Sequence, residues 1–110
     1  MNKYNAKKKT IDGITFDSKR EAEYYCELKL RKRAGDILDF KLQPEFILQD
    51  AFTDSMGNKH RAIKYRADFL VIYGVYNSEV VDVKGVKTRE YQIKKKLFLK
   101  KYPEHEFTEA

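Results

Sequence analysis

The sequence predicts a mixed α/β domain whose elements follow the order helix, three-stranded antiparallel meander, helix and strand. Two runs rich in β-branched and aromatic residues, 65–73 and 79–84, flank a short segment with Gly, Asn and Ser, which predicts a β-hairpin. Two longer segments with apolar residues at helical spacing lie on either side of the strands. No repeat and no linker divides the 110 residues, so we expect one domain over residues 1–110.

The first half of the chain is expected to contain a helix followed by a strand region. Residues 11–16 predict a small turn or strand pair. The first helix is expected at 18–33, because basic residues occupy its last turn and Gly35 follows as a terminator. Residues 37–52 predict a strand region, in which Pro44 indicates an edge position or a bulge.

The second half is expected to contain the hairpin, a helix and a final strand. Residues 53–58 are rich in turn-forming side chains and predict a loop before the hairpin. The second helix is expected at 88–102, because Pro103 cannot continue it. A last short strand is expected at 105–108.

Composition and charge restrict the class of protein. With 23 Lys and Arg against 17 Asp and Glu, the formal net charge is +6, which favours a polyanionic partner, nucleic acid first. A hydrophobic content of 42%, with eight Tyr and seven Phe, excludes a disordered chain. No apolar run is long enough to span a bilayer and no signal-peptide pattern is present, so we expect a soluble cytoplasmic protein without membrane association.

The residue types restrict the kind of metal site. Cys26 is the only cysteine, which excludes disulfides and cysteine zinc sites. His60 and His105 lie far apart in polar surroundings and are expected as exposed loop residues. Oxygen ligands remain, and these suit Mg²⁺ or Mn²⁺.

Asp68 and Asp82 are the candidate metal ligands. If the turn centres on residues 75–76, Asp68 falls opposite Asp82 or close to it. Opposed side chains across a hairpin have Cβ atoms roughly 4.5–5.5 Å apart, and like charges there are destabilising. Lys84 shares the face of Asp82, because strand residues two apart point the same way, whereas Val83 points to the other face. Two carboxylates and one ammonium group are thus expected to converge.

The surroundings of the two carboxylates support a site. Residues 69–72 and 80–83 are largely apolar, so both carboxylates are expected to be buried. Buried carboxylates need a partner or a metal. The alternative is a solvated strand face, because an acidic-x-Lys triplet is common by chance.

Glu21 is a further candidate with two interpretations. It lies on the apolar arc of the first helix, which consists of Ala22, Tyr25, Cys26 and Leu28. A glutamate among core-facing residues suggests a site. The segment 18–21 also matches a capping box, in which the glutamate bonds the backbone amide at the helix start. Both interpretations stay open at this point.

Basic residues gather at the N-terminus and on the second helix. Residues 1–10 predict a flexible lysine-rich arm that contacts phosphates, or equally a tail that only keeps the chain in solution. Residues 94–96 lie on the helix that follows the acidic-x-Lys strand, where a lysine can meet a phosphate. A run of lysines is more often a solvated face. The candidate DNA contacts in these segments are Lys8, Lys9, Lys87, Lys94 and Lys95.

An ordered set of motifs resembles the PD-(D/E)xK nuclease superfamily: Glu21, then Asp68, then the triplet 82–84, on the order helix, three strands, helix and strand. Longer segments resemble a family of small phage-encoded endonucleases long known only as a domain of unknown function. These segments are residues 16–22, 42–44, 65–69 and 81–85, together with Thr88. The similarity covers nearly the whole chain, and one departure is Ala67, which replaces the proline of the motif.

The resemblance implies a restriction-endonuclease-like core and an endonuclease that hydrolyses DNA phosphodiester bonds with Mg²⁺ or Mn²⁺. Asp68, Asp82 and the backbone carbonyl of Val83 would bind the metal. Glu21 would bind it or order its surroundings, and Lys84 would position or activate the attacking water. This assignment fits metal-assisted hydrolysis, in which the metal and the lysine neutralise charge that develops on the phosphate.

Further expectations follow from the same resemblance. Gln43 and Lys94 are weaker candidates for contacts to water or phosphate. Branched or replicating phage DNA is the expected substrate, and the host-cell cytoplasm is the expected location. Relatives of this fold that resolve four-way junctions act as homodimers, and 110 residues offer little surface for a duplex, so homodimerisation is a further expectation. Whether one or two metal ions bind remains open.

Two other functions are compatible with the sequence. The first is a non-catalytic DNA-binding module that uses the basic arm and residues 94–96. The second is a structural or partner-binding protein with a vestigial nuclease site. The complete set of two aspartates and one lysine favours the nuclease, because a degenerate site is expected to lose at least one member.

Overall fold

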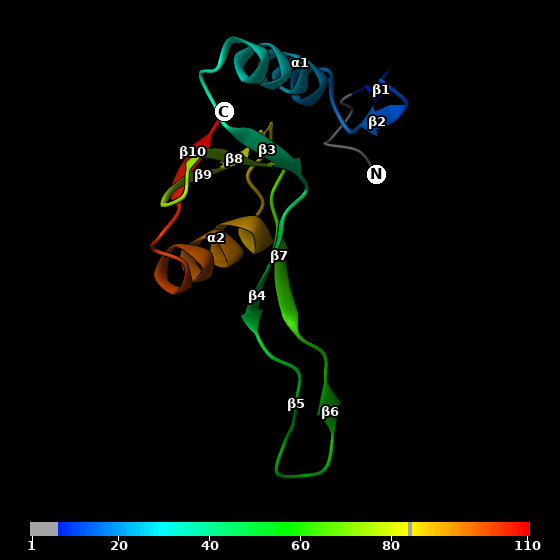
Figure 1. Cartoon of the computed structure of the whole chain (residues 1–110). Helices are drawn as coiled ribbons and strands as arrows, with labels where there is room; N and C mark the ends of the chain where they lie inside the picture. Colours follow the sequence, from blue (N-terminus) through cyan, green and yellow to red (C-terminus); the bar gives the residue numbers. More distant parts are fainter. Residues whose placement is uncertain (1–6, 84) are drawn as a thin grey trace.

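A computed structural model describes residues 7–83 and 85–110, which form a mixed α/β fold as expected (Figure 1). Helix α1 spans Lys19–Ala34 and helix α2 spans Arg89–Lys101. The strands are β1 (Lys9–Ile11), β2 (Ile14–Phe16), β3 (Asp39–Leu42), β4 (Glu45–Gln49), β5 (Phe52–Thr53), β6 (Lys59–His60), β7 (Ile63–Arg66), β8 (Phe69–Gly74), β9 (Asn77–Asp82) and β10 (Glu106–Glu109). Among the described residues, no helix is long and apolar enough to cross a membrane.

The central sheet has the strand order β10-β9-β8-β3. Strand β8 pairs antiparallel with β3 and with β9, and β10 pairs parallel with β9. The predicted order of helix, three antiparallel strands, helix and strand is therefore confirmed by α1, β3, β8, β9, α2 and β10. It differs from a simple meander, because residues 45–66 leave the sheet between β3 and β8 and form a separate ribbon.

The two faces of the central sheet carry two apolar clusters. Successive strand residues point to opposite faces, so Val80 and Val81 of β9 belong to different clusters. The cluster that includes residues of α1 consists of Phe16, Ala22, Tyr25, Leu28, Ile37, Phe69, Val71, Val81 and Val83. The cluster that includes residues of α2 consists of Tyr65, Ala67, Val80, Tyr91 and Phe98. Figure 1 shows the two helices on opposite sides of the sheet.

Helix α1 begins and ends where its capping residues predict. The Ser18 side chain accepts a hydrogen bond from the backbone N of Glu21 at 3.2 Å. At the other end Gly35 adopts a left-handed conformation with φ 83°, and its N–H bonds the carbonyls of the last turn. The predicted small strand pair is β1 and β2. Strand β1 begins at Lys9, so residues 9 and 10 are not part of a flexible arm, and residues 1–6 lie outside the described part.

Helix α2 and the elements around it also agree with the sequence. Thr88 caps α2 by accepting from the backbone N of Tyr91 at 3.1 Å, and Tyr102 follows the last helical residue. Strand β10 begins one residue later than expected and extends to Glu109. The predicted loop at 53–58 is a turn from Asp54 to Asn58, with Thr53 in β5.

The predicted strand 65–73 was wrong in one respect, because it is divided between β7 and β8. Strand β7 pairs with β4, whereas β8 pairs with β3 and β9. The partner strands β3 and β4 are separated at the same point by Gln43 and Pro44. Gln43 has a φ of 49°, and Pro44 has no N–H to donate. Gln43 N donates to Asp68 O at 2.9 Å, and Ala67 N donates to Pro44 O at 3.1 Å. The two strand regions therefore bend at the same point. The predicted strand region 37–52 is likewise divided, between β3 and β4.

Candidate functional site

Asp68 and Asp82 lie at the adjoining ends of β8 and β9, as the hairpin predicts. Phe69 pairs with Val81, so Asp68 precedes this pair and Asp82 follows it. The backbone N of Val83 donates to Asp68 Oδ2 at 2.7 Å. The carboxylate of Asp68 is therefore tied to the segment that leaves β9.

Asp82 is fully buried on the α2 face, with a relative exposure of 0%. Tyr65 Oη donates a hydrogen bond to Asp82 Oδ2. Burial raises the pKa of Tyr65, and the nearby charge of Asp82 raises it further. Tyr65 consequently keeps its proton at neutral pH and acts as a donor that holds one oxygen of Asp82.

Glu21 is brought to Asp68 by tertiary structure. Glu21 is 3% exposed, and it lines a cavity of about 160 Å³ together with Asp68 and Gln43. The remaining walls come from Ile14, Thr15, Phe16 and Leu42. The hydrogen bond from Glu21 N to Ser18 Oγ uses only the backbone of Glu21, so this part of the cap does not depend on the glutamate side chain.

Gln43 has an unusual backbone at this cavity. A φ of 49° is in the left-handed region, which costs a residue other than glycine roughly 1–3 kcal/mol and is enriched at functional sites. Its backbone N donates to Asp68 O at 2.9 Å. The strained residue thus lies against one of the two candidate ligands.

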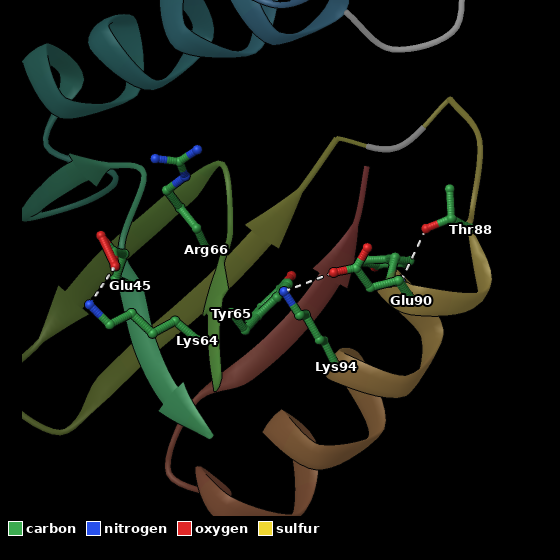
Figure 2. A pocket seen from close by; sticks show the side chains of 8 residues that line it. Glu45, Lys64, Tyr65, Arg66, Thr88, Glu90 and Lys94 are labelled. Atoms are coloured by element: carbon green, nitrogen blue, oxygen red, sulfur yellow. Dashed lines mark hydrogen bonds and ion pairs between the residues drawn. The ribbon is translucent and has the colours of Figure 1, made fainter. Parts of the chain in front are cut away.

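A second cavity of about 400 Å³ lies between the base of the ribbon and the start of α2 (Figure 2). Its lining residues are Glu45, Lys64, Tyr65, Arg66, Thr88, Glu90, Tyr91 and Lys94. Lys94 pairs with Glu90 at 3.2 Å, and Lys64 pairs with Glu45 at 3.8 Å. Because Tyr65 lines this cavity and bonds Asp82, one side chain connects the cavity to the candidate site.

The predicted DNA-contacting lysines lie in three places. Lys94 lines the second cavity, whereas Lys87 and Lys95 each pair with Glu109 Oε1 at 3.3 Å. Lys8 is exposed before β1, and Lys9 is the first residue of that strand. Lys84, the predicted catalytic lysine, lies outside the described residues.

Asp68 and Asp82 supply carboxylate oxygens, which are ligands of the kind that Mg²⁺ takes in proteins. Within residues 7–83 and 85–110, no group of three or more His, Cys, Asp and Glu side chains is placed to hold a metal. Mg²⁺ is usually held by one or two carboxylates together with substrate phosphates and water. Hydrogen bonds orient both carboxylates, that of Asp68 from the backbone N of Val83 and that of Asp82 from Tyr65 Oη. Carboxylates that bind metals are commonly oriented in this way.

Two tyrosines and one glutamate around the site were missed from the sequence. Tyr65 holds Asp82, and Tyr91 Oη donates to Glu109 Oε2 at 2.6 Å. The alternation of side chains along β7 could have indicated that Tyr65 is buried near the site, because Tyr65 and Ala67 point to the same buried face. The sequence did not indicate a role for Glu109, because this residue lay beyond the predicted last strand.

The sequence matches one protein family over residues 1–109, described as "Protein of unknown function (DUF1064)". The chain belongs to this family. Comparison with curated proteins and with solved structures gave no match. Membership in DUF1064 confirms the resemblance to a domain family of unknown function, and it assigns no activity.

Proposed function

We propose that this DUF1064 protein is a Mg²⁺-dependent endodeoxyribonuclease that hydrolyses DNA phosphodiester bonds. One observation carries the proposal: Glu21, Gln43 and Asp68, from distant parts of the sequence, line one cavity, and Asp68 is bonded to the strand end that bears Asp82. The four-stranded sheet with one helix on each face supports a restriction-endonuclease-like core. Branched or replicating phage DNA is the proposed substrate.

The protein groups have distinct roles in this proposal. Asp68, Asp82 and the carbonyl of Val83 would hold Mg²⁺ or Mn²⁺, and Glu21 would bind or order it. When bound, the metal lowers the pKa of a water molecule and neutralises charge on the phosphate. The Val83 N–H and the Tyr65 hydroxyl orient the two aspartates. Lys84 would position or activate the water and stabilise negative charge on the phosphate.

DNA binding rests on the net charge of +6 and on the position of the basic residues. Lys94 lies at the cavity beside Tyr65, where it would contact a phosphate. Lys8, Lys9, Lys87 and Lys95 are proposed as contacts farther from the bond that is cut. A homodimer would supply the surface that one small domain lacks.

A non-catalytic DNA-binding module is the second candidate. It is favoured by the finding that the described carboxylates do not form a group of three. The two candidates differ in one outcome, because only the nuclease cuts DNA when a divalent metal is added.

The test is incubation of the protein with linear, nicked and branched DNA in the presence of Mg²⁺, Mn²⁺ or EDTA. We expect cleavage with either metal and none with EDTA. Asp82→Asn should abolish cleavage while DNA binding stays intact or becomes tighter, because a negative charge that repels phosphate is lost. Asp36→Asn, which changes an exposed aspartate after α1, is the matched control. Binding without cleavage by the wild-type protein under every metal condition would establish the non-catalytic candidate instead.

A further inference from the structure

Residues 45–66 form a two-stranded ribbon, here called the arm, that projects from the body of the protein (Figure 1). Its base is anchored on α2. The ring of Phe46 lies 4.8 Å from that of Phe98, and Tyr102 Oη donates to Ile47 O at 2.8 Å. Beyond this base the arm extends away from both helices, and Phe52 and Met56 are exposed.

The tip of the arm is held in shape by local contacts. Asp54 Oδ1 accepts from the backbone N of Met56 and of Asn58, each at 2.9 Å, and Asp54 Oδ2 lies 2.8 Å from His60 Nε2. The rings of Phe52 and His60 stack at 4.6 Å. An isolated two-stranded ribbon has little stability of its own, and these local contacts hold the tip in a defined conformation where the arm extends away from both helices.

Positive charge is concentrated on the returning side of the arm. Lys59, Arg61, Lys64 and Arg66 follow one another there over roughly 23 Å at the rise of an extended strand. Within the described residues, Lys59, Arg61 and Arg66 make no ion pair, whereas Lys64 pairs with Glu45. The arm also contains Asp50 and Asp54, and Asp54 is engaged with the tip.

This row of cations leads to the candidate site. Lys64 and Arg66 line the cavity of about 400 Å³, where Tyr65 lies between them in sequence and bonds Asp82 (Figure 2). A duplex that follows the arm would therefore come to the cavity beside Tyr65, the residue whose hydroxyl bonds Asp82. Double-stranded DNA matches the arm in charge, and its major groove admits a two-stranded β-ribbon.

We propose that the arm binds double-stranded DNA beside the bond that is cut, with Lys59, Arg61 and Arg66 contacting phosphates and the tip entering the groove. This inference rests on the proposed function for the position of the cut, and duplex binding by the arm is testable without cleavage.

The experiment compares Lys59→Gln/Arg61→Gln with the control Arg33→Gln/Lys100→Gln, which removes the same charge from two exposed positions outside the arm. Binding of each protein to a fluorescently labelled DNA duplex is measured by anisotropy in EDTA at several salt concentrations. Loss of two phosphate contacts should flatten the dependence of log K on log salt by about 1.8 for the arm variant. The control should keep the wild-type slope. Circular dichroism checks that both variants are folded.

Three results separate the possible failures. Equal slopes for the arm variant and the control would overturn the arm proposal, whether or not the wild-type protein cuts DNA. A flattened slope for the arm variant alone supports the arm, even if no cleavage is found and the nuclease proposal fails. Dissociation of a dimer in the arm variant, with duplex binding equal to the control, would assign the arm to self-association and also overturn the proposal.

Discussion

On the α1 face the central sheet buries mainly hydrocarbon, whereas on the α2 face it buries hydroxyl and carboxylate groups together with apolar side chains such as Val80 and Phe98. Leu28, Val71 and Val81 are completely buried toward α1. Toward α2, Asp82 is equally buried and is bonded by Tyr65. The same strand, β9, supplies Val81 to one face and Asp82 to the other.

This difference shows how a small protein can bury an acidic group. Apolar packing on the α1 face stabilises the sheet, and the α2 face provides the donors that a buried carboxylate requires. Tyr91 and Glu109 form a second tyrosine–carboxylate pair, in which the tyrosine hydroxyl donates as it does between Tyr65 and Asp82. Glu21 is the exception on the α1 side, because it is an acidic residue buried against the hydrocarbon cluster.

The largest change in stability is expected on the α2 face, for Tyr65→Phe. Removal of the hydroxyl takes a donor from a buried carboxylate, which costs about 1–3 kcal/mol of unfolding free energy. Cleavage should also fall if Asp82 is a metal ligand. Urea denaturation measures the first effect. Tyr76→Phe, at a turn position that is 97% exposed, should change stability by less than about 0.5 kcal/mol. Equal stability of the two variants would contradict the role of Tyr65.

A smaller effect is expected at Glu109, and it depends on pH. Hydrogen bonds from Tyr91, Lys95 and Lys87, with Tyr91 first, lower the pKa of the Glu109 carboxyl. The ionised Glu109 carboxylate therefore stabilises the folded protein fully above the pKa of the unfolded state, about 4.3. This stabilisation is lost as pH falls through the lower pKa of the folded state. Glu109→Gln should cost about 0.5–1 kcal/mol at neutral pH, in the range of partly exposed ion pairs.

The difference between wild type and Glu109→Gln should therefore shrink below about pH 4. Urea denaturation at a series of pH values measures it, and Glu104→Gln, an exposed change, is the control. A difference that persists unchanged at acid pH would show that Glu109 does not stabilise the fold through its charge.

The smallest change in stability is expected on the α1 face, for Glu21→Gln. Glutamine keeps a side-chain oxygen for a capping role but loses the charge that a metal site needs. Stability should stay within about 0.5 kcal/mol of wild type, while most Mg²⁺-dependent cleavage is lost. Thermal unfolding and the DNA cleavage assay measure the two effects. Normal cleavage by Glu21→Gln would leave Glu21 as a cap only.

The sequence contained enough to place most elements, because the signals for them are local. Ser18 and Gly35 delimit α1, and Thr88 and Pro103 delimit α2, since caps and terminators act through neighbouring backbone groups. The turn between β8 and β9 set the register that brings Asp68 and Asp82 to adjoining strand ends. The candidate carboxylates were found in this way.

Other features depend on partners that are distant in the chain, and only tertiary structure decided them. The break between β7 and β8 arises because β4 and β3 diverge at Gln43 and Pro44, which no pattern within residues 65–73 indicates. The cavity shared by Glu21 and Asp68 requires α1 to pack on the sheet. Local propensity describes the preferences of one segment, whereas these contacts depend on which segments the two apolar clusters bring together.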